Sequence, residues 1–443
     1  MEIEPTKIEW SLPMGLLTEL SNKGKVYFVG GFVRDKLLKI ERTDQDILIT
    51  NISPDLLIEI LRKYGFAEWV GKSFRVAKFH YGGNVYDFSI PSERTIHSAR
   101  QIPNMSIQDD LRQRDFTINA VAYDITNHKY IDPTGGVEDI ENGIIRMVNP
   151  DVFSADPLRV IRLCRLRAKL DFNIDKKTKE SAISSVSLLE EISSERIGEE
   201  FYKIMKLNKP SDAFRCMLKL GILDKILPEL SACSGVTQPG GMHAYDVFEH
   251  TMRTIDESPA EPLVRFSALF HDITKPRHRD VQADGRARFY GHQITAEKVA
   301  RKWLTRYAFS HKFADNVAKL VRYHMFTHAE TDKGVRRFIR RVGQELIPAI
   351  FELRFADTRA QGLGGDINSE QEYKNRVMRI ISEKPPLSVR DLEVDGHDVM
   401  RILNIPPGPQ VGEVLEKLLE MVIDEPLKND RDILISVIQN MDK

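Results

Sequence analysis

Two aspartates near the N-terminus, Asp44 and Asp46, are separated by one residue at the start of an apolar run. Side chains at positions i and i+2 of a strand point to the same face, so we expect the two carboxylates to lie together. Carboxylates held this close repel each other unless a cation lies between them, and such oxygen ligands suit Mg²⁺. Asp87, which alternates with Tyr86 and Phe88 in a second β-like run, is the candidate third carboxylate.

A double glycine, Gly30-Gly31, ends another β-like run, and Arg34 follows at the start of a helical stretch. Glycine lets a phosphate approach the backbone, and a helix N-terminus favours anions. Either the glycines or the aspartate pair alone is typical of an ordinary loop. The order strand, glycines, helix and aspartates instead predicts a nucleotide-phosphate site that includes Gly30, Gly31 and Arg34.

Asp156 and Arg159 are three residues apart at the start of a helical stretch, so they share one face. A carboxylate that accepts from an amino group, beside a guanidinium that donates to a ring nitrogen, would admit cytosine and adenine and reject guanine and uracil. Each group left unsatisfied costs about 1–3 kcal/mol. Asp-Pro is also typical of a helix N-cap, and both roles can coexist. Arg162 and Arg165 continue a basic stripe suited to phosphates, with a solvated surface helix as the alternative.

The C-terminal half contains six spaced histidines and aspartates whose chemistry suits a metal site. Imidazole nitrogens with bridging carboxylates favour Mn²⁺, Ni²⁺, Fe or Zn²⁺, and such a site activates water for attack on a phosphate ester. The six candidates are His250, His271, Asp272, His292, His324 and Asp357. Their order resembles the HD phosphohydrolase superfamily in its two-metal version. Relatives carrying this domain have 2′,3′-cyclic phosphodiesterase and phosphatase activities, which would suit the cleaning of damaged RNA 3′ ends. A retained but inactive HD fold is the alternative.

The elements that must position these residues change character near residue 150. β-like runs at Lys25–Val29, Asp46–Thr50, Arg75–His80 and Val85–Ser89 interleave with helical stretches, and Gly82-Gly83-Asn84 is a hairpin signal. From Asp156 to Asn440 almost every segment has helical periodicity. We therefore predict an α+β protein, with an N-terminal α/β head followed by all-helical domains.

The glycine and aspartate segments resemble the signature of polymerase β-like nucleotidyltransferases. The resemblance is to the bacterial-type (class II) tRNA nucleotidyltransferases and their poly(A) polymerase relatives. Residues 110–120 are similar to the family motif DLxRRDFTINA, with Gln113 in place of an arginine. The resemblance implies that Arg112, Arg114 and Asn119 bind the nucleotide.

Further segments resemble other motifs of the same family. Residues 132–139 are similar to the motif that follows DLxRRDFTINA, and residues 155–159 resemble the EDxxR motif, with Ala155 replacing the glutamate. Residues 195–200 resemble a helix-buttressing motif, in which we interpret Arg196 and Glu200 as a structural pair.

The resemblance implies transfer of nucleotides from CTP or ATP to a tRNA 3′-hydroxyl, with two Mg²⁺ ions and release of pyrophosphate. It divides the chain into a head (1–150), a neck (151–235), an HD domain (236–384) and a tRNA-binding tail (385–443). The alternatives are CC-only or A-only addition, a poly(A) polymerase, or a phosphohydrolase whose head merely binds RNA. The loop between Ile90 and Asp109, where the family switches specificity, does not separate full from partial addition.

Bulk properties limit the remaining classes. The 443 residues are 42 % hydrophobic and 29 % charged, with a net charge of −1, so any RNA contact must come from a local basic face. The sequence contains no apolar run of about 18 residues and no secretory signal, so we expect no membrane association. Cys164, Cys216 and Cys233 are far apart and form no CxxC pair, which favours a reducing, cytoplasmic location. The oligomeric state is not indicated.

Overall fold

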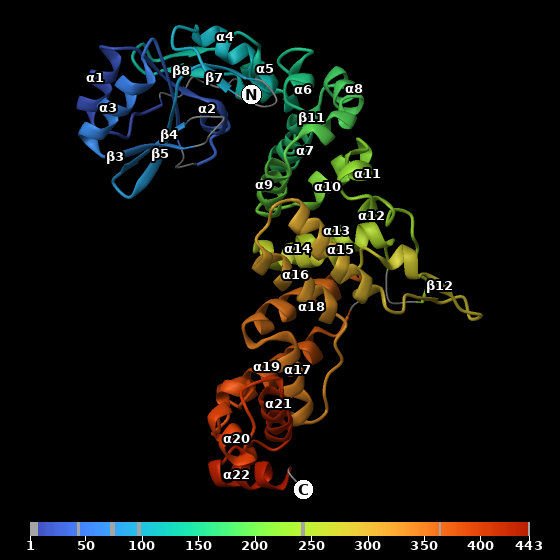
Figure 1. Cartoon of the computed structure of the whole chain (residues 1–443). Coiled ribbons are helices and arrows are strands. Elements are labelled where there is room, and N and C mark those ends of the chain that lie inside the picture. Colours follow the sequence, from blue (N-terminus) through green and yellow to red (C-terminus); the bar gives the residue numbers. More distant parts are fainter. Residues whose placement is uncertain are drawn as a thin grey trace. The chain divides into compact units, whose positions relative to one another are not determined.

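The computed structural model describes residues 8–41, 45–70, 76–94, 99–240, 244–362 and 365–441 (Figure 1). The chain divides into two compact units, Met1–Pro228 and Glu229–Lys443. Our finer division, at residues 150, 235 and 384, stays a prediction. Asp44 lies outside the described residues.

The first unit is built on a seven-stranded mixed sheet with strand order β3-β4-β5-β2-β1-β8-β9. Its strands are β1 (Lys25–Val29), β2 (Asp46–Thr50), β3 (Phe66–Val70), β4 (Val76–Tyr81), β5 (Asn84–Ser89), β8 (Ala122–Asp124) and β9 (Lys129–Ile131). β2 and β5 pair in parallel and the other neighbours pair antiparallel. Four residues each of β1 and β2 are buried, as expected for strands covered on both faces. Two-stranded pairs form from β6 (Ser92–Arg94) with β7 (Ala99–Gln101) and from β10 (Ile144–Ile145) with β11 (Asn173–Ile174).

Helices complete the first unit, and α2 begins directly where β1 ends. The helices are α1 (Met14–Ser21), α2 (Gly30–Leu37), α3 (Pro54–Tyr64), α4 (Ile107–Arg112), α5 (Gly136–Glu141), α6 (Val152–Ala155), α7 (Leu158–Leu170), α8 (Lys176–Ser184), α9 (Ser194–Met205), α10 (Ser211–Lys219) and α11 (Ile222–Ile226). α7 packs against α9 and α10. The short α12 (Pro228–Ser231) spans the division between the units.

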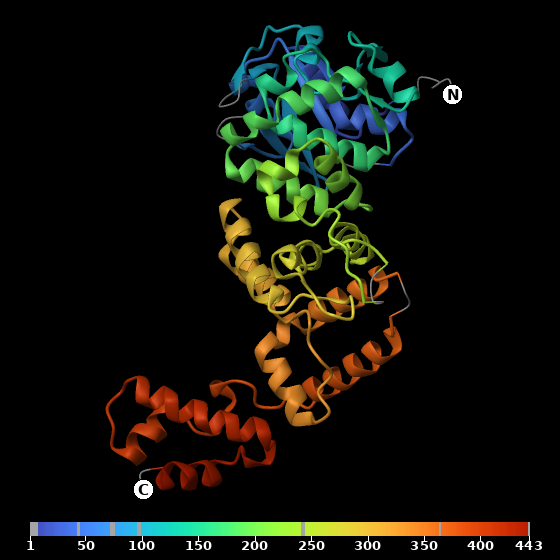
Figure 2. The same cartoon turned by 90° about the vertical axis from the view of Figure 1, so that its right-hand side faces the viewer.

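The second unit is helical except for a hairpin of β12 (Asp280–Val281) and β13 (Ala287–Arg288). Its helices are α13 (Val247–Glu257), α14 (Pro262–Phe270), α15 (His292–Arg306), α16 (His311–Tyr323), α17 (Asp332–Val342), α18 (Ile347–Ala360), α19 (Ile367–Ser382), α20 (Gly396–Leu403), α21 (Pro409–Asp424) and α22 (Arg431–Asn440). The last three, red in Figure 2, share an apolar core. None of the helices in the described ranges is long and apolar enough to cross a bilayer.

The fold class is confirmed: a mixed α/β head precedes a helical region. The predicted strands at residues 25–29 and 46–50 have the expected bounds, the strand predicted at 75–80 is observed at 76–81, and that predicted at 85–89 begins one residue earlier. Sequence reasoning missed β3, an edge strand whose first residue, Phe66, is largely exposed. Strand recognition depends on a regular alternation of apolar and polar residues, and an edge strand with an exposed aromatic residue lacks it.

Candidate functional site

The head brings two of the three predicted carboxylates together. Asp46 opens β2 and is the register partner of Asp87 in β5, so both side chains leave the sheet on the same face. Asp87 also accepts hydrogen bonds from Lys78 Nζ at 2.7 and 3.0 Å, and Lys78 lies opposite it in β4. The lysine balances part of the negative charge on this face. The position of Asp44 beside Asp46 stays a prediction.

Gly30 lies where the head needs a residue without a side chain. Its φ of +69° falls in the left-handed region, and a Cβ there would lie 3.1 Å from Arg114 Nη1 and 3.6 Å from Asp46 Oδ2. A guanidinium nitrogen and a carboxylate oxygen therefore both lie beside the first residue of α2, on the side where a side chain would point. Gly31, partly exposed, follows in the first turn.

Arg34, one turn further along α2, contacts Asn119. The Arg34 side chain is buried and donates to Asp35 Oδ1 and, at 2.5 Å, to Asn119 Oδ1. Lys169 of α7 pairs with the second oxygen of Asp35 at 3.0 Å. These contacts join α2, the turn at residues 117–119 and α7. A direct nucleotide contact by Arg34 or Asn119 stays a prediction.

The two arginines of the 110–120 segment have different surroundings. Arg114 donates twice to Asp110 Oδ2, at 3.0 and 2.9 Å, while its Nη1 faces Gly30. Arg112 is mostly exposed and lies 3.6 Å from Asp109. Gln113, where the family has an arginine, accepts from Arg159 through its main-chain oxygen at 3.1 Å. Any residue provides a main-chain oxygen, so the glutamine in place of the family's arginine does not affect the contact with Arg159.

The basic stripe of α7 faces buried carboxylates. Arg162 pairs with Asp115 at 3.1 Å, and Arg165 pairs with Glu200 at 2.6 Å. Burial opposes ionisation of Asp115, but the charges of Arg162 and Arg159 outweigh it and hold the Asp115 pKa far below its ordinary value. Burial likewise opposes ionisation of Glu200, and Arg165 and Arg162 lower its pKa. The phosphate contacts predicted for Arg162 and Arg165 remain predictions, and the structure shows these residues in ion pairs.

The predicted base-reading pair lies at the start of α7. Arg159 is buried; its Nη1 and Nη2 donate to the carbonyls of Val152 and Gln113, and its Nε has no hydrogen-bond partner within the described ranges. Asp156 accepts from Leu158 N at 3.3 Å, so it caps the helix, and from Arg196 Nη2 at 2.7 Å. We interpreted Arg196 and Glu200 from sequence as one pair. In the structure Arg196 binds Asp156, just before α7, and Glu200 binds Arg165 of α7. Base reading itself stays a prediction.

In the second unit the six predicted ligands form one cluster, in which four histidines lie within 4 Å of the Asp272 carboxylate and Asp357 joins through His250. Asp272 Oδ2 is 3.1 Å from His271 Nε2 and 3.6 Å from His250 Nε2, and Asp272 Oδ1 is 3.2 Å from His292 Nε2 and 3.8 Å from His324 Nε2. Asp357 Oδ1 lies 2.9 Å from His250 Nε2. Two groups of three donors suit a metal ion, one on each side of Asp272.

Main-chain carbonyls orient three of these imidazoles. His271, His292 and His324 each donate from Nδ1 to a carbonyl at 2.7 Å, so in the neutral ring the lone pair belongs to Nε2. His292 Nε2 is a buried atom that directs this lone pair at the Asp272 carboxylate without forming a hydrogen bond. Burial and the neighbouring His271 lower the pKa of His324 to about 3, which keeps this ring neutral at neutral pH. Lone pairs that converge in this way suit a metal cation.

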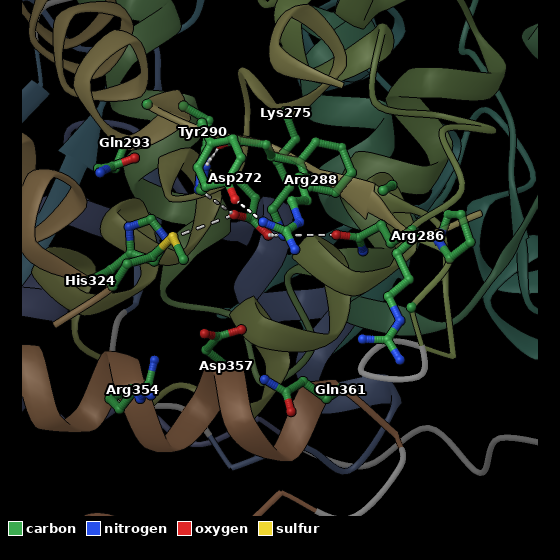
Figure 3. Close-up of a pocket in the computed structure, with 18 residues that line it drawn as sticks. Asp272, Lys275, Arg286, Arg288, Tyr290, Gln293, His324, Arg354, Asp357 and Gln361 are labelled. Carbon is green, nitrogen blue, oxygen red and sulfur yellow. Dashed lines mark hydrogen bonds and ion pairs between the residues drawn. The ribbon is translucent and has the colours of Figure 1, made fainter. Parts of the chain in front are cut away.

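A pocket of about 550 Å³ opens beside Asp272 and is ringed by cationic side chains (Figure 3). Lys275 bridges Asp272 Oδ2 and Gln238 Oε1 at 2.7 Å each. Arg286, Arg288 and exposed Tyr290, from the hairpin and the segment after it, also line this pocket. Sequence reasoning missed Lys275, although it follows Asp272 by three residues, and it missed the hairpin arginines, which no spacing rule links to the histidines.

The head and its carboxylate face define a nucleotidyltransferase of the polymerase β type. The family model described as "Poly A polymerase head domain" matches residues 26–146, and that of "Probable RNA and SrmB- binding site of polymerase A" matches residues 171–233. The model of tRNA nucleotidyltransferase domain 2 matches residues 289–438.

Among characterised relatives, the A-adding tRNA nucleotidyltransferase of Deinococcus radiodurans is 34 % identical over 330 residues, covering 71 % of this chain and 75 % of that protein. The CC-adding tRNA nucleotidyltransferase of Thermus thermophilus is 30 % identical over 413 residues, covering 88 % of each chain. The Bacillus stearothermophilus CCA-adding enzyme in complex with CTP has the same fold, with a TM-score of 0.68, 22 % identity, and coverage of 97 % of this chain and 96 % of that one. The chain belongs to the class II tRNA nucleotidyltransferase family.

Proposed function

We propose that this protein adds C, A or both to the 3′ ends of tRNA from CTP and ATP, with release of pyrophosphate. The arrangement at Gly30 carries the proposal. The first residue of α2 is a glycine, and a guanidinium (Arg114) and a carboxylate (Asp46) lie beside it. Relatives named as A-adding and CC-adding enzymes support the substrate class. They leave the choice between full and partial addition to experiment.

The carboxylates of the head fit Mg²⁺, because Asp46 and Asp87 present only oxygen ligands on one face. Asp44 would complete this set. Bound Mg²⁺ would favour deprotonation of the 3′-hydroxyl and neutralise the leaving pyrophosphate. Arg114 and the start of α2 would hold the triphosphate, and Asp156 with Arg159 would select the base by hydrogen bonding.

The activity is tested with purified protein and three transcripts: tRNA lacking the CCA end, tRNA ending in C, and tRNA ending in CC. CTP and ATP are supplied singly and together, and the products are sized at single-nucleotide resolution. Full addition, CC-only addition, A-only addition and a homopolymer give four different ladders. A homopolymer, or no extension of any transcript, would contradict the proposal.

The carboxylates are tested by Asp46→Asn and Asp44→Asn. We expect incorporation to fall by at least about 100-fold, because loss of a carboxylate charge at the metal site weakens transition-state charge stabilisation, which is typically worth 10²–10³ in rate. tRNA binding, measured by filter retention, should survive. Glu59→Gln, an exposed change on α3, is the matched control. Near-normal incorporation by Asp46→Asn would refute the assignment.

We also propose that the second unit is a metal-dependent phosphohydrolase that acts on RNA 3′-terminal phosphates. The converging Nε2 atoms support it, since three of them are oriented by carbonyls and meet one buried carboxylate. A bound transition metal would act as a Lewis acid for water and phosphate. Lys275, Arg286 and Arg288 would bind the phosphate oxygens, and Tyr290 offers a stacking surface.

This second proposal is tested by metal content and hydrolysis in the full-length chain. After dialysis against Mn²⁺, Ni²⁺ or Zn²⁺, elemental analysis should find one or two ions per chain, and Asp272→Asn should lose them. His311→Ala, an exposed histidine on α16, should keep them. Metal binding without hydrolysis of a nucleoside 2′,3′-cyclic phosphate would favour the retained but inactive fold. Equal metal content in all three proteins would contradict the site.

A further inference from the structure

A second pocket, of about 520 Å³, adjoins the metal pocket in the second unit. The two pockets share Gln293 and Met325 in their linings. Gln293 directly follows His292, and Met325 directly follows His324. Consecutive Cα atoms are about 3.8 Å apart, so the border between the pockets lies next to two candidate metal ligands. Because the two pockets are contiguous, a molecule bound at the metal centre can extend directly into the second pocket.

The lining of this pocket is cationic. It contains Arg322, Arg337 and Arg341, and no aspartate or glutamate is among its lining residues within the described part of the chain. We call it the arginine pocket. A guanidinium presents a planar set of donors that matches phosphate oxygens, so a surface of this composition selects for phosphate.

The arginines are incompletely paired by the protein. Arg322 Nη1 and Arg337 Nε are buried atoms without a hydrogen-bond partner in the described ranges. Arg322 Nε lies 3.8 Å from Glu297, and Arg337 Nη2 lies 3.0 Å from Asp424 and 3.7 Å from Glu420. For Arg341, no hydrogen bond or ion pair to another described residue is found. Arg341 is exposed and lines the same pocket, so its guanidinium is available to an added phosphate acceptor.

The border itself is apolar. Met325 is 56 % exposed between the two pockets, and Phe326 and Phe338 form a wall of the arginine pocket. A ribose or base can pack on the thioether while the charged groups on either side of it reach the two pockets. Along this path the metal centre is followed by the apolar side chain of Met325 and then by the arginines. A nucleic acid strand has the same alternation: a phosphate, a nucleoside and the next phosphate.

We infer that the arginine pocket binds a backbone phosphate of an RNA strand whose phosphorylated 3′ end lies at the metal centre. The substrate is then a polynucleotide and not a free nucleotide. This inference rests on the phosphohydrolase proposed above. Hydrolysis of a terminal 2′,3′-cyclic phosphate forms a P–O bond to water, breaks one ribose P–O bond, and transfers a water proton to the leaving ribose oxygen.

The kinetic test compares two substrates in the full-length, Mn²⁺-loaded protein: a trinucleotide ending in a 2′,3′-cyclic phosphate and the corresponding mononucleoside 2′,3′-cyclic phosphate. Arg341→Gln should lower kcat/KM for the trinucleotide about ten-fold and leave the mononucleoside unchanged. Arg340→Gln is the matched control, because Arg340 pairs with Glu416 and Glu420 and does not line the pocket. Equal losses on both substrates, or none, would overturn the inference.

A binding test separates the pocket from the hydrolase. Arginine modification by phenylglyoxal is quantified residue by residue with mass spectrometry, in the presence of a trinucleotide 3′-phosphate, a mononucleotide 3′-phosphate or inorganic phosphate. The trinucleotide should protect Arg341 several-fold more than either smaller ligand. If wild-type protein hydrolyses neither cyclic phosphate, the phosphohydrolase fails, and the protection pattern still decides the pocket. Equal protection by inorganic phosphate would show that the pocket takes any phosphate and would contradict RNA binding.

Discussion

At the scale of single residues, Gly30 shows how one backbone position assembles a site. Its positive φ disfavours a side chain, and Arg114 Nη1 would have to shift to make room for one, whereas Gly83, in the turn between β4 and β5, has a positive φ and no described atom within 4 Å of an added Cβ. The backbone conformation therefore favours glycine at both positions, and only at Gly30 would a side chain also meet neighbouring atoms.

Alanine substitutions at these two positions distinguish the effect of backbone strain from the effect of contact with Arg114. We expect Gly30→Ala and Gly83→Ala each to lose about 1–2 kcal/mol of unfolding free energy, because an L-residue is strained at positive φ. Only Gly30→Ala should also lose nucleotide incorporation, by at least about 100-fold, because the new methyl group displaces Arg114. Urea unfolding and primer-extension assays measure the two effects. Equal incorporation by both variants would contradict the proposed role of Gly30.

At the scale of elements, a layer of ion pairs joins α7 to α9 and to the head. Glu200 of α9 is buried and accepts from Arg165 at 2.6 Å and from Lys203 at 3.3 Å, with Arg162 at 3.7 Å. Arg196, on the same helix, binds Asp156 at the start of α7. The position and tilt of α7, and with it Arg159, therefore depend on charges contributed by α9.

Glu200→Gln should destabilise the first unit by about 2 kcal/mol at pH 7. This is less than the 3–5 kcal/mol typical of a broken buried pair, because Arg162 and Arg165 keep some contact with water. The folded-state pKa of Glu200 is lowered from 4.5, so its contribution is present above about pH 4.5 and is lost as the pH falls through the folded-state pKa.

Urea unfolding at pH 7 and in acid measures this effect. The difference between wild type and Glu200→Gln should shrink as the pH falls below 4.5. Glu199→Gln, exposed on the same helix, should change little at either pH. A difference that is constant with pH would show that the carboxylate charge is not the cause.

At the scale of the whole molecule, the C-terminal helices α20–α22 have their own apolar core and are held to the rest of the second unit through α17. Arg336 is buried and donates to the carbonyls of Ile423 and Asp424, at 2.6 and 3.0 Å, at the end of α21. Those carbonyls have no helical partners of their own, so the arginine caps the helix from outside. Arg340, by contrast, pairs with two exposed glutamates, Glu416 and Glu420.

Arg336→Met should lower the unfolding free energy of the second unit by about 1–3 kcal/mol, because it leaves two carbonyls without a donor. Arg340→Met should lower it by about 1 kcal/mol or less, as is usual for exposed pairs. Amide hydrogen exchange in α21 should rise in Arg336→Met and stay near wild type in Arg340→Met. Similar exchange in both variants would mean that the buried cap does not hold α21.

The sequence alone was sufficient for the fold class and the family, because both rest on local patterns: strand and helix periodicities, Gly30-Gly31 before a helix, and the 110–120 segment. It also named Asp272 and the five residues that cluster with it, whose order along the chain was already informative. The tertiary structure alone decided what these side chains touch. Arg162 and Arg165 bind carboxylates because α9 packs on α7, and Cys164 and Cys216, 52 residues apart, become neighbours at 2.6 Å in the same packing.

The arginine pocket and the ring of cations at Asp272 were likewise decided only by the tertiary structure. They join residues from separate helices and a hairpin, and no periodicity records such distances. Local patterns specify which element forms, since they depend on neighbours within a few residues. The partner of a charge depends on which elements pack together, and that is a property of the folded chain.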